Sequence, residues 1–242
     1  MLNFQNCEKE YVASNENNIL ASVSHDLRNP LSAIIHAAEF LEEDNQNTLN
    51  PDSICLLKSI KDSSKEALEM VSDLLDVLQI NSGKFNANLD HKIDIKEIIK
   101  RCIQLTHHLY YKKQININFT TEDNLPNIHL DNRRMKQILI NIISNSVKYS
   151  KDKTEITINT KVITKLNDKF LQITVKDQGF GMSPEELKLS LKDYKVVDDR
   201  RIDSFGLGMS LIKQLVEAQN GYMLIKSKKN VGTKFYLNFP IK

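Results

Sequence analysis

The stretch from Leu20 to Leu41, "LASVSHDLRNPLSAIIHAAEFL", sets the architecture of the first third of the chain. Apolar and small residues recur along it in alternating steps of four and three, which is the spacing of a heptad seam on one side of a helix. The seam runs through Leu20, Ser24, Leu27, Leu31, Ile34, Ala38 and Leu41. We therefore predict an amphipathic helix that buries one stripe of its surface.

A second seam follows the polar segment 43–53, in which Asn50 can cap a helix and Pro51 suits its first position. It consists of Leu57, Ile60, Ser64, Ala67, Val71, Leu74 and Leu78. Two such helices joined by a loop of about ten residues are typical of an antiparallel hairpin. Because a lone hairpin buries little apolar surface, we predict a homodimer in which two hairpins form a four-helix bundle.

The histidine of the opening stretch lies off the seam. His25 and Asp26 fall at positions b and c of the heptad, so both are expected to face water. Pro30 has no N–H for the carbonyl four residues back, and it should bend or loosen the helix one turn after His25. Asp26 can orient the imidazole and leave its other nitrogen as a nucleophile, and Asp26 with Asn29 can hold a water. Because an isolated His-Asp pair is more often a plain surface feature, this assignment depends on the second half of the chain.

Composition bounds the remaining possibilities. The chain has 242 residues, of which 40% are hydrophobic and 26% charged, as in ordinary globular proteins. With 33 basic and 31 acidic residues the net charge is +2, too small to favour a nucleic acid as partner. The three cysteines show no metal-binding or redox spacing and are expected to be reduced thiols. No apolar run approaches the roughly 18 residues of a membrane span, so we expect a cytoplasmic chain without a membrane segment.

The seams stop at "NSGKFNANLD", residues 81–90, where glycine and asparagine interrupt the helical pattern. We divide the chain into an N-terminal extension 1–17, a helical hairpin 18–82, a linker 83–90 and a second domain 91–242. The second domain reads as a short strand and helix over 93–110, strands at 114–121, 154–163 and 169–177, and a long helix over 131–150. A helix over 208–221, ended by Gly221, and a final hairpin of strands 222–228 and 232–239 follow. This order predicts an α/β sandwich, a mixed sheet with helices covering one face.

The long helix 131–150 carries a polar face. Asn141, Asn145 and Lys148 lie at spacings of four and three residues, and Tyr149 follows directly. An amide oxygen, an ammonium group and an aromatic ring on one face suit a divalent cation, a phosphate and a flat base. This face is therefore a candidate nucleotide site.

Two glycine-containing segments complete that candidate site. "DQGFGM" ends a strand with Asp177, Gly179 and Gly181, where the glycines allow close approach and the carboxylate can accept the amino group of adenine, which guanine does not offer at that place. Gly206, Leu207 and Gly208 stand directly before a helix, where free N–H groups bind phosphate. No Lys-Ser or Lys-Thr pair follows, so this is not a Walker loop.

In this order, "SHDLRNPL", "NIISNSVKYS", "DQGFGM", "GLGMSLIKQL" and "GTKFYLNFP" resemble the catalytic core of a two-component sensor histidine kinase. The resemblance covers residues 18 to 240 and implies a phosphotransfer hairpin followed by a Bergerat-type ATP-binding domain. It implies that His25 accepts the phosphoryl group, that Asp26 is its acid–base partner, and that Asn29 assists dephosphorylation of the partner.

The resemblance also implies roles in the second domain. Asn145 matches the magnesium ligand, with Asn141 in support, Lys148 contacts phosphate, Tyr149 packs on adenine and Asp177 accepts from its amino group. Gly179, Gly181, Gly206, Leu207 and Gly208 shape the pocket. Arg200 and Arg201 lie in the lid and can neutralise the triphosphate, although a solvated charge run explains them equally well.

The expected function is autophosphorylation of His25 from MgATP and transfer to an aspartate of a response regulator receiver domain. The segment 188–204 departs from the family, because Leu191 and Tyr194 are the only candidates for its two lid phenylalanines. Three alternatives follow: a phosphatase-dominant bifunctional sensor, a non-catalytic dimeric phosphotransfer adaptor, and a chaperone- or topoisomerase-type ATPase. The adaptor has no need for Asn145, Lys148 and Asp177, and the ATPase has no need for a histidine on a heptad hairpin.

Overall fold

A computed structural model defines residues 27–42, 50–81, 87–89, 92–123, 125–191 and 207–241. By internal contacts the chain separates into two compact units, Met1–Phe85 and Asn86–Lys242, which are described one at a time. His25, Asp26, Arg200, Arg201 and Gly206 lie outside the described residues.

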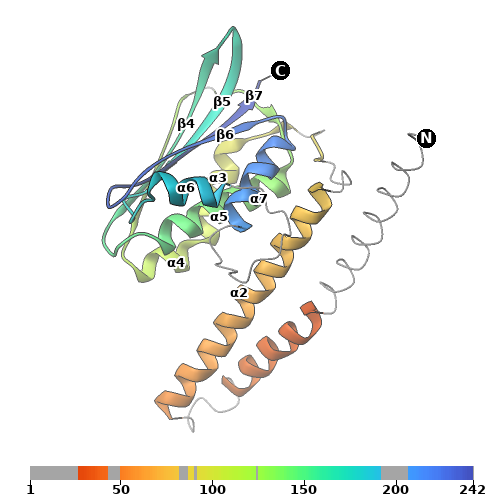
Figure 1. Cartoon of the computed structure of the whole chain (residues 1–242), viewed down its shortest axis with the longest axis vertical. Helices are drawn as coiled ribbons and strands as arrows, with labels where there is room; N and C mark the ends of the chain where they lie inside the picture. Colours follow the sequence, from red (N-terminus) through yellow and green to blue (C-terminus); the bar gives the residue numbers. More distant parts are fainter. Residues whose placement is uncertain are drawn as a thin grey trace, which may run out of the picture. The chain divides into compact units, whose positions relative to one another are not determined.

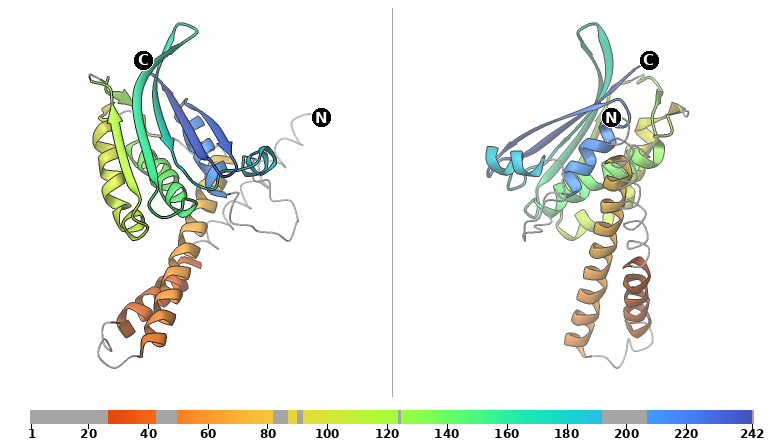
Figure 2. Two further views of the ribbon diagram at one scale, coloured as in Figure 1. Left: turned by 90° about the vertical axis from the view of Figure 1, so that its left-hand side faces the viewer. Right: turned by 45° about the vertical axis from the view of Figure 1, so that its right-hand side comes forward.

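Within its described residues, the first unit contains two helices, which run antiparallel (Figure 2). One occupies residues 27–42 and continues through Pro30, and the other is α2, Pro51–Asn81. The predicted cap of α2 is confirmed, because Ser53 N donates to Asn50 Oδ1 at 2.7 Å. Ion pairs join Glu42 to Lys61 and Glu39 to Lys65. The later residue of the first helix pairs with the earlier residue of α2, as expected for antiparallel helices.

The seam residues of this unit are only partly covered within one chain. Ala38 and Ser64 are buried, whereas Leu27, Ile34, Leu41 and Ile60 each keep more than two fifths of their surface exposed. A surface helix ordinarily buries its apolar stripe against a neighbour. The exposed part of the seam therefore offers a face for a further helix pair.

The second unit is built on a mixed five-stranded sheet in the order β2-β4-β5-β7-β6. The strands are β2 (Asn116–Thr121), β4 (Glu155–Lys165), β5 (Asp168–Lys176), β6 (Tyr222–Lys228) and β7 (Gly232–Pro240). β2 runs parallel to β4, and all other neighbours are antiparallel. The short strands β1 (Lys92–Ile93) and β3 (Ile128–His129) form a separate antiparallel pair.

Helices cover one face of this sheet, as Figures 1 and 2 show. They are α3 (Ile95–Leu105), α5 (Asn132–Lys148) and α7 (Leu207–Glu217), with α5 between the other two. Fully buried side chains of α5 and α7, among them Ile142, Ile143 and Leu211, form a core with the sheet residues Ile158, Ile173 and Leu237. The predicted fold, a helical region followed by a mixed sheet with helices on one face, is confirmed.

Two predicted helices differ from the structure. The helix expected through Tyr110 breaks at Thr106, whose hydroxyl donates to Cys102 O and Ile103 O, and α4 (His107–Lys112) begins anew. This hydroxyl competes with the regular helical pattern. The helix expected to end at Gly221 ends at Glu217 instead, and Asn220 adopts the left-handed conformation, with φ 59°.

Gly221 is needed for a different reason. A Cβ there would lie 2.8 Å from Asn238 O, so the glycine allows the chain to enter β6 against β7.

A further short helix, α6 (Pro184–Ser190), was not expected from the sequence. Within the described ranges, none of the helices combines the length and the apolar character that a membrane span requires.

Candidate nucleotide site

Asp177 follows the last residue of β5 and is 5% exposed. Its Oδ1 atom accepts from Gly179 N and from Thr233 N, both at 2.9 Å, and its Oδ2 atom accepts from the Ser146 hydroxyl at 3.4 Å. Burial raises the pKa of the Asp177 carboxyl above its usual value, and these hydrogen bonds only partly oppose the shift. The site thus holds a buried carboxylate whose Oδ2 keeps capacity for another donor.

The helix α5 and the start of α7 meet beside this carboxylate. Ser146 lies on α5, next to Asn145, and a Cβ added to Gly208 on α7 would lie 3.9 Å from Asn145 Nδ2. Lys148 ends α5, with its Nζ atom 5.9 Å from the centroid of the Tyr149 ring. The structure therefore brings Asn145, Lys148, Tyr149, Asp177 and Gly208 into one region of the second unit. Asn141 is half-buried one turn earlier on α5.

The glycines after Asp177 bring backbone segments together. A Cβ on Gly179 would lie 2.5 Å from Tyr149 O, and Phe180 N donates to that same oxygen at 3.0 Å. Gly181 has φ 60°, and its Cβ would lie 2.0 Å from Lys228 O. Both glycines thus have a structural reason that does not depend on a ligand: they join the turn after Asp177 to the end of α5 and to the β6–β7 hairpin.

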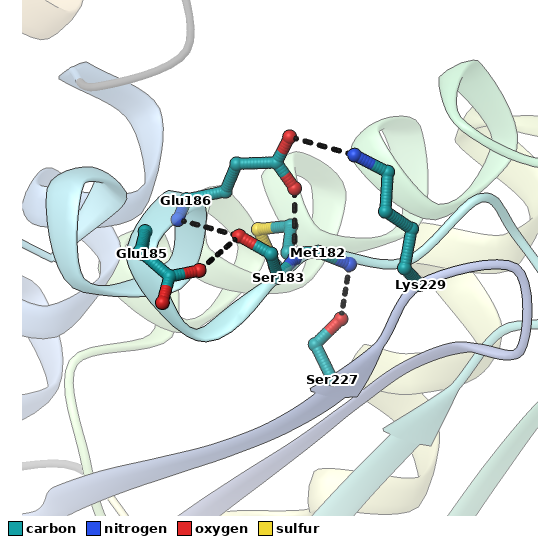
Figure 3. Close-up of polar contacts among 6 residues, drawn as sticks. All are labelled: Met182, Ser183, Glu185, Glu186, Ser227 and Lys229. Atoms are coloured by element: carbon teal, nitrogen blue, oxygen red, sulfur yellow. Dashed lines mark hydrogen bonds and ion pairs between the residues drawn. The ribbon is translucent and has the colours of Figure 1, made fainter.

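The helix α6 is anchored on that hairpin (Figure 3). Ser183 caps α6 by accepting from Glu186 N at 3.2 Å, while Ser183 N donates to Glu186 Oε2 at 2.7 Å. Met182 N donates to Ser227 Oγ at 2.8 Å, and the Lys229 ammonium lies 3.3 Å from Glu186 Oε1. Ser227 Oγ in turn lies 2.9 Å from Thr233 Oγ1. The entry to α6 is therefore linked through β6 and β7 to the residue that donates to Asp177.

Several sequence-predicted residues cannot be placed in this site. His25, Asp26, Arg200, Arg201 and Gly206 lie outside the described residues, and so does Tyr194. Leu207 is the first residue of α7. Asn29 is exposed on the helix of residues 27–42, in the other unit.

Sequence reasoning missed two residues of the site, Ser146 and Thr233. Both contact the Asp177 side chain. Ser146 lies in the motif "NIISNSVKYS" and Thr233 in "GTKFYLNFP". Neither motif indicates that these residues donate hydrogen bonds to Asp177. Only the packing of α5 and the register of β5 with β7 bring these donors to the carboxylate.

Two family models match the chain. Residues 15–83 match the His Kinase A (phospho-acceptor) domain, and residues 130–242 match the histidine kinase-, DNA gyrase B- and HSP90-like ATPase. The first range includes His25, Asp26 and Asn29, and the second includes every predicted residue of the nucleotide site.

The chain is also similar to curated proteins and solved structures. It is 28% identical over 245 residues to the cell-division control histidine kinases PdhS of Brucella ovis and Brucella anthropi, with 96% of this chain covered but only 23% of each relative's length. Full-length ShkA, solved in complex with AMPPNP, shares 22% identity and a TM-score of 0.71 over 93% of this chain and 46% of its own. AdeS of Acinetobacter baumannii shares 17% identity and a TM-score of 0.61 over 90% of this chain and 98% of its own.

These findings agree with the geometry of the second unit and with the helical hairpin of the first. The solved structures share the fold, and the family models identify the two domains in the order that the motifs predict. The chain carries the two domains of the catalytic core of a two-component sensor histidine kinase.

Proposed function

We propose that the second unit binds MgATP and that this chain autophosphorylates His25. One observation carries the nucleotide part of the proposal: Asp177 is buried, fixed by two backbone N–H groups, and has spare acceptor capacity on Oδ2. The hydrogen bond that Oδ2 accepts from the Ser146 hydroxyl is long, at 3.4 Å, so this oxygen can also accept from a donor on a ligand. The exocyclic amino group of adenine is such a donor, and guanine carries an acceptor at the corresponding position.

The residues on α5 and α7 fit the rest of that ligand. Asn145 supplies an amide oxygen for Mg²⁺, with Asn141 in support, and Lys148 supplies an ammonium for a phosphate. Gly208 presents a surface without a side chain beside Asn145. When bound, Mg²⁺ neutralises charge on the phosphates.

The chemistry proposed for His25 is a direct displacement. A neutral imidazole nitrogen attacks the γ-phosphorus, a P–N bond forms, the P–O bond to the β-phosphate breaks and ADP leaves. Asp26 accepts a hydrogen bond from the other ring N–H and so favours the positive charge that develops on the ring. An aspartate oxygen of a response regulator receiver domain then attacks the phosphorus, the P–N bond breaks and His25 is recovered.

The PdhS proteins are named as histidine kinases, and ShkA was solved with AMPPNP, which supports both the reaction class and the nucleotide. The chain spans only 23% of the length of PdhS, so the proposal is restricted to the reaction of the catalytic core. We place the reaction in the cytoplasm, where ATP is available. The exposed seam residues Ile34, Leu41 and Ile60 support a homodimer through the hairpin.

Titration calorimetry with MgATP and MgGTP tests the nucleotide assignment. The chain should bind MgATP and discriminate against MgGTP by about tenfold or more, because guanine places an acceptor against the Asp177 carboxylate. Asp177→Asn, which keeps the shape but presents an amide, should weaken MgATP more than MgGTP. Equal affinity of the wild-type chain for both nucleotides would refute the role of Asp177.

A further inference from the structure

The side chain of Lys113 contacts the C-terminal end of α5. It follows the last residue of α4, and its Nζ atom donates to Val147 O at 2.9 Å, Lys148 O at 3.0 Å and Ser150 O at 2.9 Å. An ammonium group has three N–H donors, so all of them are used. The last carbonyls of a helix have no partners within the helix, and this end carries partial negative charge. Lys113 donates to the carbonyls of the last two residues of α5 and to that of Ser150 just beyond it, and places its charge at the favourable end. Val147 O also accepts from Ser150 N at 3.3 Å.

The turn that Lys113 holds carries two residues of the nucleotide site, Lys148 and Tyr149. The carbonyl of Tyr149 lies between those that Lys113 binds, and it accepts instead from Phe180 N at 3.0 Å. The backbone from 147 to 150 is therefore fixed from two sides, by Lys113 and by the turn that follows Asp177. Without the ammonium group, one of these two supports is lost.

The position of Lys113 is itself held by its local backbone. Gln114 adopts the left-handed conformation, with φ 54°, and Ile115 N donates to Tyr110 O at 3.0 Å, which ends α4. Lys113 O accepts from Lys153 N at 2.9 Å, so the backbone of this residue also contacts the loop after α5. This arrangement aims the side chain at the α5 terminus before any ligand is present.

We propose that Lys113 is a positioning residue for nucleotide binding: it holds the C-terminal turn of α5 so that Lys148 and Tyr149 are presented in a geometry ready for the ligand. Its charge also offsets the negative end of the α5 dipole, which is an unfavourable neighbour for an anionic nucleotide. The inference rests on the proposed function, because it takes Lys148 and Tyr149 as nucleotide contacts. It goes beyond that function in assigning a role to a residue on another element.

The test compares Lys113→Met, Lys113→Arg and the matched control Lys112→Met, which removes a lysine from the last turn of α4. MgADP and MgATP affinities are measured by calorimetry at a temperature where circular dichroism shows each variant folded. Lys113→Met should weaken both nucleotides by about tenfold, equivalent to about 1.4 kcal/mol. Lys112→Met should match the wild type, and Lys113→Arg should recover most of the affinity because it keeps the charge.

Hydrogen exchange supplies a readout that does not depend on the ligand. In Lys113→Met the Phe180 amide should exchange faster, because its acceptor, Tyr149 O, is no longer fixed, while amides in the core strand β5 keep their protection. If Lys113→Met does not fold, Lys113→Gln is measured in the same way. A folded variant with wild-type nucleotide affinity and unchanged Phe180 protection would overturn the inference, whereas a wild-type chain that binds neither nucleotide would overturn the proposed function.

Discussion

Thr233 N, at the start of β7, donates to Asp177 Oδ1 at 2.9 Å, although the two residues stand 56 positions apart in the chain. The register of β5 with β7 explains this hydrogen bond. Lys176 pairs with Lys234 in the antiparallel ladder, so the next residue of the chain, Asp177, lies opposite Thr233. Asp177 N also donates to Thr233 O at 2.9 Å. The sheet itself therefore positions the Asp177 carboxylate, which we propose accepts a hydrogen bond from the amino group of adenine.

The raised pKa of Asp177 predicts a pH dependence of stability. The Asp177 carboxyl binds its proton more tightly in the folded chain than in the unfolded chain, where its pKa is near the ordinary value of 3.8. The unfolding free energy of the wild type, compared with Asp177→Asn, should therefore be largest below about pH 4 and fall as the pH rises through the raised pKa. Urea titrations between pH 4 and pH 8 measure this difference. A difference that grows with pH would mean that the donors Gly179, Thr233 and Ser146 outweigh burial.

Two glycine substitutions should separate structure from binding. Gly181→Ala places a Cβ on a backbone with φ 60° and 2.0 Å from Lys228 O, so it should lose at least about 2 kcal/mol of unfolding free energy. Among the described residues, a Cβ in Gly208→Ala would meet only Asn145 Nδ2, at 3.9 Å, so the stability of this variant should stay within about 1 kcal/mol of the wild type. MgATP affinity should nevertheless fall in Gly208→Ala, because the methyl group occupies the surface beside Asn145. Unchanged affinity in that variant would remove Gly208 from the site.

Cys55 and Cys102 should differ sharply in reactivity. Burial raises the pKa of the Cys102 thiol to about 11, and the side chain is fully buried on α3, whereas Cys55 is exposed on α2. A thiol reagent at pH 8 should label Cys55 in the native chain and label Cys102 only after unfolding. Peptide mapping by mass spectrometry assigns the label. Native labelling of Cys102 at the rate of Cys55 would contradict the packing of α3 against α5.

The anchor of α6 predicts unequal effects for two neighbouring polar contacts. Ser183→Ala removes the acceptor for Glu186 N and should cost about 1 kcal/mol of unfolding free energy, as loss of a helix cap does. Lys229→Met removes an ion pair between two exposed side chains and should cause no measurable change. Thermal melts of both variants make the comparison. A larger loss in Lys229→Met than in Ser183→Ala would show that the ion pair, not the cap, holds α6.

Regular elements could be predicted because their periodicity reflects the faces that they bury. The α5 residues Ile138, Leu139, Ile142 and Ile143 recur at helical spacing and are all fully buried. Alternation in β5 likewise anticipated the burial of Leu171, Ile173 and Val175. The predicted grouping of Asn145 with Asp177 followed from motifs, and the structure brings their elements together through Ser146 and Gly208.

Features that depend on a single competing contact could not be read from a pattern. The break at Thr106 depends on where its hydroxyl donates, and the end of α7 depends on Asn220 accepting a left-handed backbone that glycine was expected to supply. The role of Lys113 was equally hidden, because the carbonyls that it binds lie 34 to 37 residues away. Such contacts exist only once the tertiary fold is formed.

The most direct test of the account is labelling with [γ-³²P]ATP and Mg²⁺, applied to the wild-type chain, His25→Gln and Asn145→Ala. The labelled band is then treated with acid and with alkali. We predict label on the wild type that is lost in acid and stable in alkali, as expected for a phosphoramidate, and no label on either variant. Label that survives acid, or that persists in His25→Gln, would contradict a kinase that phosphorylates His25.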